Sequence, residues 1–119
     1  MITIMPATEA ELMQLGAPDG AAALILREPE GITGHAFFTI DGDTVELLAV
    51  QANEPVMTDG LIRSVLGAAD YRGAKYGVCR VPELFPHLRG LEFREDEPGV
   101  WRIVIEDFFR LPCPGEAEA

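Results

Sequence analysis

The chain has 119 residues, which suffices for one domain and is too short for two of ordinary size. Hydrophobic residues make up 48% of it, as in chains that bury a single core. The formal net charge is −11, from 20 acidic and 9 basic residues, which argues against nucleic-acid and anionic-membrane partners because both need clustered Lys and Arg.

The location and metal content are predicted from what the chain lacks. It has no apolar run of membrane-spanning length and no basic, apolar leader, so we expect a cytoplasmic protein. Cys79 and Cys113 are far apart, and His35 and His87 are isolated, so no metal site is expected. Cys113 is interpreted as an idle thiol in a C-terminal tail, 113–119, that follows a single domain over 1–112.

The N-terminal quarter predicts a strand, a helix and a second strand. A short strand is expected over Ile2–Met5. Thr8 and Glu11 have the spacing of a capping box, which satisfies two open N–H groups at a helix start, and Gly16 suits the helix end. The run "AALILRE", Ala22–Glu28, is then typical of a strand.

A hairpin is predicted in "GHAFFTIDGDTVELLAV", where two β-rich runs flank Asp41-Gly42. Asp-Gly is the pair that type I′ hairpin turns favour. Phe38 would share one face with Ile40, and Phe37 the other with Thr39. Both faces therefore carry apolar groups, which indicates a sheet covered on both sides.

The second half predicts a long helix followed by a strand. Apolar residues recur at helical spacing from about Asp59 to Arg72, and "YGVCRV", Tyr76–Val81, is typical of a strand. A proline-broken helical segment, Pro82–Gly90, comes next. The runs "LEFRE" and "VWRIVIEDFF" then predict a last strand pair, with Phe108 and Phe109 in the core.

The predicted order is β-α-β-β-β-α-β-α-β-β. A strand, a long helix and another strand form a right-handed crossover, which makes those two strands parallel, whereas the hairpins are antiparallel. The fold class is therefore α/β (α+β), with a mixed central sheet and helices on both faces.

This element order, with "DTVELLAV", "DGLIRSVL", "AADYRGAKYGVCRV" and a late helix before "LRGLEF", resembles the GNAT family of N-acetyltransferases. The resemblance implies that the strand before the long helix diverges from its parallel neighbour and that acetyl-CoA enters the gap. The pyrophosphate would then rest on amides at the helix N-terminus. The implied cofactor residues are Val50, Ala52, Thr58, Asp59, Gly60, Leu61 and Ile62.

The loop departs from the family pattern at several positions. Gly60 occupies the first glycine position, but Met57 stands where the family has Arg or Gln, and Ile62 replaces the second glycine. Glu54 and Asp59 add negative charge near the phosphates, and Asp59 would begin the helix as N-cap or first-turn residue.

Glu46 is the candidate catalytic base, because the family often places a carboxylate on this strand. The alternative is a Glu that only faces solvent. His35 is expected near Glu46 across the hairpin. On the late helix Leu88 or Pro86 stands at the family's tyrosine position, and His87 beside them is interpreted as solvent-exposed and catalytically silent.

Two function classes follow. The first is a GNAT-like N-acetyltransferase that uses acetyl-CoA and no metal to modify a small-molecule amine or basic peptide. The second is a non-catalytic GNAT-fold module that has lost the cofactor site and binds a protein or small molecule. The sequence leaves open whether the chain is a monomer or a homodimer.

Overall fold

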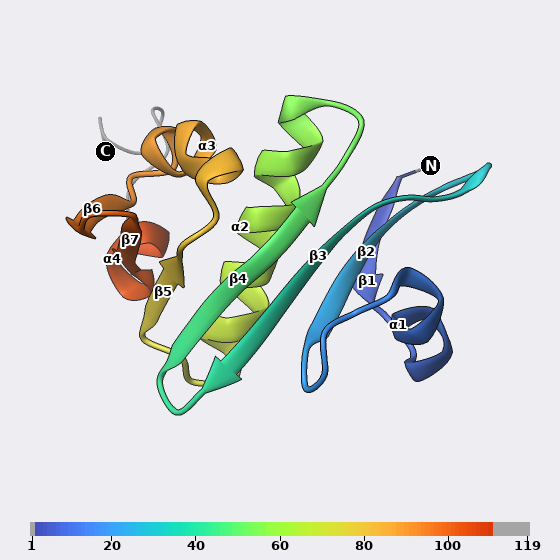
Figure 1. Ribbon diagram of the computed structural model, residues 1–119, viewed down its shortest axis with the longest axis horizontal. Helices are drawn as coiled ribbons and strands as arrows, with labels where there is room; N and C mark the ends of the chain where they lie inside the picture. The colour runs from blue at the N-terminus through green and yellow to red at the C-terminus, as the bar shows by residue number, and fades with distance from the viewer. Residues whose placement is uncertain (1, 111–119) are drawn as a thin grey trace.

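A computed structural model describes residues 2–110, without the side chain of Arg110, so Cys113 and the expected tail 113–119 lie outside the described residues. Seven strands form one sheet in the order β1-β2-β3-β4-β5-β7-β6 (Figure 1). The strands are β1 Thr3–Pro6, β2 Ala22–Glu28, β3 Gly31–Asp41, β4 Thr44–Gln51, β5 Tyr76–Cys79, β6 Arg94–Glu97 and β7 Val100–Val104. The helices are α1 Glu9–Leu15, α2 Pro55–Tyr71, the 3-10 turn η1 Pro82–Leu84, α3 Phe85–Gly90 and α4 Ile105–Arg110.

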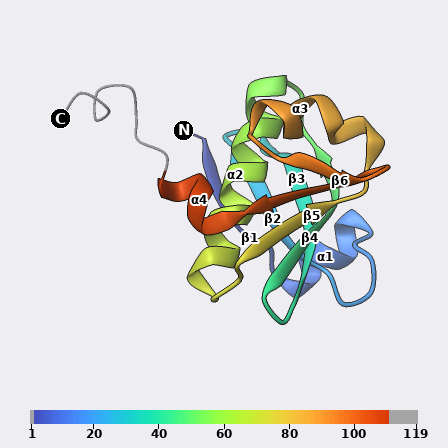
Figure 2. The same cartoon turned by 90° about the vertical axis from the view of Figure 1, so that its left-hand side faces the viewer.

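Helices lie on both faces of the sheet, as the sequence predicts. Figure 2 shows α2 and α4 on one side of the strands and α1 on the other. All the pairings are antiparallel except the one between β4 and β5, which the crossover through α2 makes parallel. The α/β fold with a mixed sheet is confirmed.

The main core lies between α2 and the sheet. One stripe of α2 is completely buried, and it packs on side chains of β2, β3 and β4 such as Leu24, Phe38 and Leu47. Burial of a Leu, Ile or Val side chain contributes roughly 1.5–3 kcal/mol each. The stripe consists of Leu61, Ile62, Val65, Leu66 and Ala69.

The start of α2 differs from the prediction. The helix begins at Pro55 with Glu54 as N-cap, four residues before the expected Asp59. Proline suits the first helical position because its fixed φ is helical and its missing N–H would have no acceptor there. Asp59 therefore lies in the second turn and is neither the N-cap nor a first-turn residue.

The N-terminal predictions are confirmed and the hairpin turn is corrected. Thr8 and Glu11 form both bonds of the capping box, at 2.9 and 3.2 Å, and Gly16 ends α1 in the left-handed conformation. In the hairpin, however, Gly42 has φ 61° and Asp43 has no positive φ. A type I′ turn needs two positive φ values, so the turn has instead the Gly-first pattern of type II′.

The end of the domain also differs from the prediction. The expected strand through "VWRIVIEDFF" stops at Val104, and the chain continues as helix α4. Ile105 is fully buried and donates its N–H to the Lys75 carbonyl at 2.9 Å, which fixes the start of the helix. Phe108 packs against the core as expected, whereas Phe109 is half exposed.

The segment after α3 holds an unusual backbone conformation. Glu92 has φ 71°, the only positive φ at a non-glycine residue among the described residues. Its N–H bonds to Arg89 O at 3.2 Å, and the N–H of Phe93 bonds to Leu88 O at 3.0 Å. These two bonds define a Schellman motif, in which Glu92 holds the position that usually carries glycine.

We expect Glu92→Gly to stabilise the protein by about 0.5–1 kcal/mol, because glycine adopts this φ without a Cβ penalty. Thermal and urea unfolding would measure the change. Leu91→Gly is the matched control, since Leu91 has φ −95° and is buried, so this variant should be less stable. A Glu92→Gly protein less stable than the parent would show that the Glu92 side chain makes a favourable interaction that outweighs the strain.

Candidate functional site

The parallel strands β4 and β5 separate at one end, forming a fork. They pair from Thr44↔Tyr76 to Leu47↔Cys79, and there the pairing stops. Strand β4 continues to Gln51, held on its other side by β3. Residues 48–51 of β4 therefore have no strand on their β5 side, and their backbone groups there are open to a ligand.

A β-bulge at Leu48 sets the geometry of the fork. Phe38 pairs with Leu47 while the adjacent Phe37 pairs with Ala49, so Leu48 is an extra residue in β4. A one-residue shift exchanges the faces of all following side chains. Val50 consequently packs against the core on the α2 side of the sheet.

The N-terminus of α2 lies beyond the end of β4 (Figure 1) and offers few donors to an anion. Pro55 has no N–H, and the N–H groups of Met57 and Thr58 bond to Glu54 O at 3.0 and 3.1 Å. Val56 remains as the first-turn donor. The exposed carboxylate of Glu54, which makes no side-chain capping bond, stands at the same helix end.

The implied cofactor residues fall into three groups. Val50 and Ala52 lie at the fork and contact the core. The side chains of Thr58, Leu61 and Ile62 are buried. Asp59 and Gly60 are partly exposed in the second turn of α2. The N–H groups of residues 59–62 belong to the continuous helix, so contact there would be made through side chains or the bare Gly60 surface.

Glu46 lies on the sheet face opposite α2, because its neighbours Val45 and Leu47 point into the core. Its side chain is 31% exposed, and its Oε2 accepts a hydrogen bond from Arg80 Nη1 at 2.7 Å. This bond raises the pKa of the Arg80 guanidinium. Arg80 directly follows β5, so the ion pair joins the two strands where the fork opens.

The sequence analysis does not predict that Arg80 pairs with Glu46, although the register of the parallel strands β4 and β5 implies this pair. Glu46 pairs with Val78, so Arg80, two residues later, returns to the same face. The expected position of His35 near Glu46 is wrong. Thr39 lies opposite Glu46, whereas His35, four residues before Thr39 on β3, lies opposite Gln51.

His35 occupies an apolar environment instead. Its ring lies 4.5 Å from that of Phe37, centroid to centroid. Burial lowers the pKa of the His35 imidazole. The neutral ring is therefore favoured in the folded state, and it has no proton-transfer partnership with Glu46.

His87 forms a second polar link near the fork. Its Nδ1 lies 2.8 Å from Asp59 Oδ1, which joins α3 to α2, and its side chain is only 25% exposed. The expectation of a solvent-exposed histidine is thus corrected, because the ring is partnered and largely covered. Leu88 is buried and Pro86 has no proton to give, so neither can act as an acid.

Residues 2–110 show neither a metal-ligand cluster nor a membrane-spanning helix. In that range no three His, Cys, Asp or Glu side chains are grouped to hold a metal ion. No helix there is long and apolar enough to cross a membrane.

Comparison with known proteins gives structural matches only. No family model matches the sequence, and no curated protein matches it significantly. Among solved structures, the Escherichia coli ribosomal-protein-S18-alanine N-acetyltransferase superimposes with TM-score 0.73 and 12% identity, covering 88% of this chain and 94% of that one. A GNAT family acetyltransferase from Elizabethkingia anophelis, with acetyl-CoA bound, gives TM-score 0.69 and 13% identity over 87% and 97% of the two chains.

A third match is a chimera of the spermidine N-acetyltransferase SpeG from Vibrio cholerae and hSSAT, with TM-score 0.73 and 9% identity over 92% of this chain and 99% of that one. At these identities the matches report the fold. The superposition covers 87–92% of this chain, so it includes most of the seven-stranded sheet and its helices. The chain therefore has the GNAT fold of the N-acetyltransferases.

Proposed function

We propose that this protein is a GNAT-like N-acetyltransferase that transfers an acetyl group from acetyl-CoA to an amine. The observation that carries the proposal is the fork, where residues 48–51 of β4 are open on the β5 side. An extended, amide-containing cosubstrate can pair with such a backbone edge, in the manner of an added strand. The Elizabethkingia match, which holds acetyl-CoA, supports this choice of cosubstrate.

The residues present fit the two ends of acetyl-CoA unequally. The open edge of β4 suits the amide-rich arm, and no charged side chain is needed there. At the α2 N-terminus the helix dipole and the Val56 N–H favour a phosphate, while the Glu54 carboxylate opposes it. A charge pair of this kind costs on the order of 1 kcal/mol at a solvated surface. We therefore propose weak acetyl-CoA binding.

The chemistry requires a neutral amine. In the transfer the neutral amine nitrogen forms a bond to the acetyl carbonyl carbon and the C–S bond breaks. The nitrogen then loses a second proton, which the leaving thiolate takes up. Glu46 would accept the proton lost by the ammonium group, directly or through one water, with Arg80 holding its carboxylate in place. The net charge of −11 suits a cationic acceptor, either a small amine or a basic peptide.

The same helix terminus favours a second candidate function, a GNAT-fold module without catalysis. Pro55 lacks an N–H, the next two N–H groups are taken by Glu54 O, and Glu54 itself is acidic. Such an N-terminus is sufficient to start a helix, but it has few free N–H donors with which to bind an anion. In this alternative the fork binds a protein segment or small molecule and acetyl-CoA does not bind.

Glu54→Gln should tighten CoA binding several-fold, because it removes a negative charge beside the phosphate and retains the side-chain size. Isothermal titration calorimetry with CoA, at two salt concentrations, would measure the effect and its screening. Glu83→Gln, an equal charge change on η1, is the control. CoA affinity that does not respond to Glu54→Gln would place the phosphates elsewhere.

Gly60→Ala and Gly67→Ala should each stabilise the unliganded protein by about 0.5–1 kcal/mol, because both glycines are inside α2 and a Cβ meets no atom closer than 3.8 Å. Gly60→Glu should abolish the CoA-induced rise in Tm, because it places a carboxylate one helical turn from the Val56 N–H that would hold the phosphate. Gly67→Ala should leave that rise intact. A rise that survives in Gly60→Glu would remove Gly60 from the site.

Glu46→Gln should lower kcat about a hundredfold or more, with KM for the amine little changed, because the shape is kept and the base is lost. His87→Ala should leave kcat nearly unchanged. Acetyl transfer to a panel of polyamines, amino acids and basic peptides is the assay. Full activity in Glu46→Gln would show that the protein is an enzyme but that Glu46 is not its base. Absence of both CoA binding and acetyl transfer across the panel would favour the non-catalytic module.

A further inference from the structure

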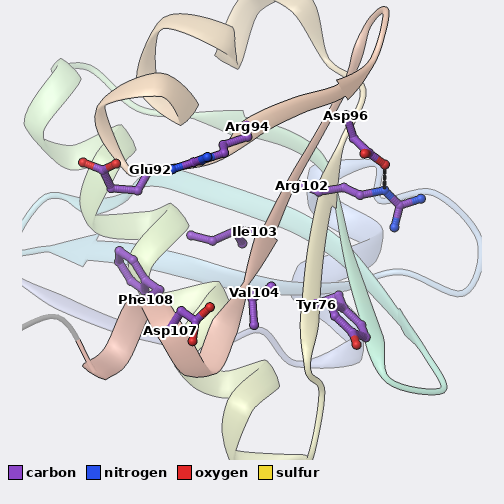
Figure 3. Close-up of a pocket in the computed structure, with 9 residues that line it drawn as sticks. All are labelled: Tyr76, Glu92, Arg94, Asp96, Arg102, Ile103, Val104, Asp107 and Phe108. Atoms are coloured by element: carbon purple, nitrogen blue, oxygen red, sulfur yellow. Dashed lines mark ion pairs between the residues drawn. The ribbon is translucent and has the colours of Figure 1, made fainter.

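A cavity of about 670 Å³ lies between the β6–β7 hairpin and α4 (Figure 3). It contains none of the fork residues and neither Glu46 nor Arg80, so it is separate from the site described above. Its walls come from β5, β6, β7, α4 and the turn after α3.

The cavity exists because β6 is too short to cover β7. Pairing between them begins at Arg94↔Arg102, and β7 continues to Val104. Before Arg94 the chain turns away through the left-handed Glu92. Backbone groups alternate along a strand, and the N–H of Ile105 points to β5, so the N–H of Val104 points to this uncovered edge.

The floor of the cavity is apolar. Ile103 and Val104 come from β7 and Phe108 from α4. The Phe108 ring is held in place by the Arg63 guanidinium, whose Cζ lies 5.4 Å from the ring centroid. Val104 is 42% exposed and Tyr76 40% exposed, whereas most large apolar side chains of the sheet are buried.

The rim is charged, and most of its charges lack partners. Arg102 Nε forms an ion pair with Asp96 Oδ2 at 2.9 Å. No ion pair joins Arg94, Glu92 or Asp107 to another residue in the described part of the chain. In Figure 3 Arg94 and Glu92 lie along one wall and Phe108 and Asp107 along the other, with Ile103 between them.

We propose that this cavity binds a small zwitterion with an apolar body, the chemistry of a free amino acid with an apolar side chain. The ligand carboxylate bonds to the Arg94 guanidinium and the Val104 N–H, and its ammonium group faces Glu92 and Asp107. The apolar body covers Ile103 and Phe108.

The charge pattern selects a zwitterion over simpler ligands. An anion without an ammonium group would meet the two unpaired carboxylates, and a cation without a carboxylate would meet the unpaired guanidinium. A neutral apolar molecule would cover the floor but would make no bond to these three exposed groups, which would stay paired with water alone. Only a ligand with both charges satisfies the rim and fills the floor.

Calorimetry on the whole protein tests this with four probes that share one ring: phenylalanine, phenylalanine amide, N-acetylphenylalanine and 2-phenylethylamine. We expect phenylalanine to bind with a Kd of about 1 mM or below, and each analogue that lacks a charge to bind at least tenfold more weakly. The amide of Val104 should shift in the NMR spectrum on titration. Absence of phenylalanine binding up to about 10 mM would overturn the proposal.

Variants of the rim residues test which protein group pairs with each charge of the ligand. Arg94→Gln should lose most of the preference for phenylalanine over phenylalanine amide, because the ligand carboxylate loses its charged partner and keeps only the Val104 N–H. Glu92→Gly, which we expect to fold more stably than the parent, should lose part of the preference for phenylalanine over N-acetylphenylalanine. Arg72→Gln, an equal charge change on the exposed residue after α2, should change nothing. Unaltered selectivity in both Arg94→Gln and Glu92→Gly would refute the assignment of the cavity.

Discussion

The burial of one face of α2 against β2, β3 and β4 is the interaction on which the rest of the molecule depends. The stripe from Leu61 to Ala69 has no exposed surface, and truncation of such residues to Ala costs roughly 2–5 kcal/mol each. With α2 fixed on the sheet, the crossover must bring β5 alongside β4 in parallel. The chain then leaves the sheet after Cys79 to form η1 and α3, and the fork is the space that remains.

The polar groups around the fork indicate what this scaffold can do. Glu46 and Arg80 bridge the two strands on one face, and Asp59 and His87 bridge α2 and α3 at the sheet end. The first pair holds the Glu46 carboxylate in a defined place, as a site that positions an amine requires, whereas the second only joins the two helices. The α2 N-terminus is the weaker half of the site, since Pro55 and the Glu54 carbonyl remove most of its free donors.

Local chemistry predicted much of the fold. The sequence predicts the capping box at Thr8, the buried stripe of α2 and the crossover. Each of these features depends on residues that are close together in the sequence. The sequence does not predict that α2 starts at Pro55, because the N-cap residue Glu54 makes no side-chain capping bond and "PVM" contains no capping side chain. The sequence predicts a strand in place of α4, because Ile103 and Ile105 have the two-residue spacing of one strand face. In the structure Ile105 is instead the buried first residue of the helix.

The site was less predictable because its contacts span the chain. Glu46 and Arg80 are 34 residues apart, and Asp59 and His87 are 28 apart. The most direct test of the account is the amide NMR spectrum of the protein titrated with CoA. We predict that the largest shifts fall on Leu48–Gln51 of β4 and on Val56, with β1 and β2 unaffected. CoA binding that leaves those amides unmoved, or no binding at all, would contradict the account.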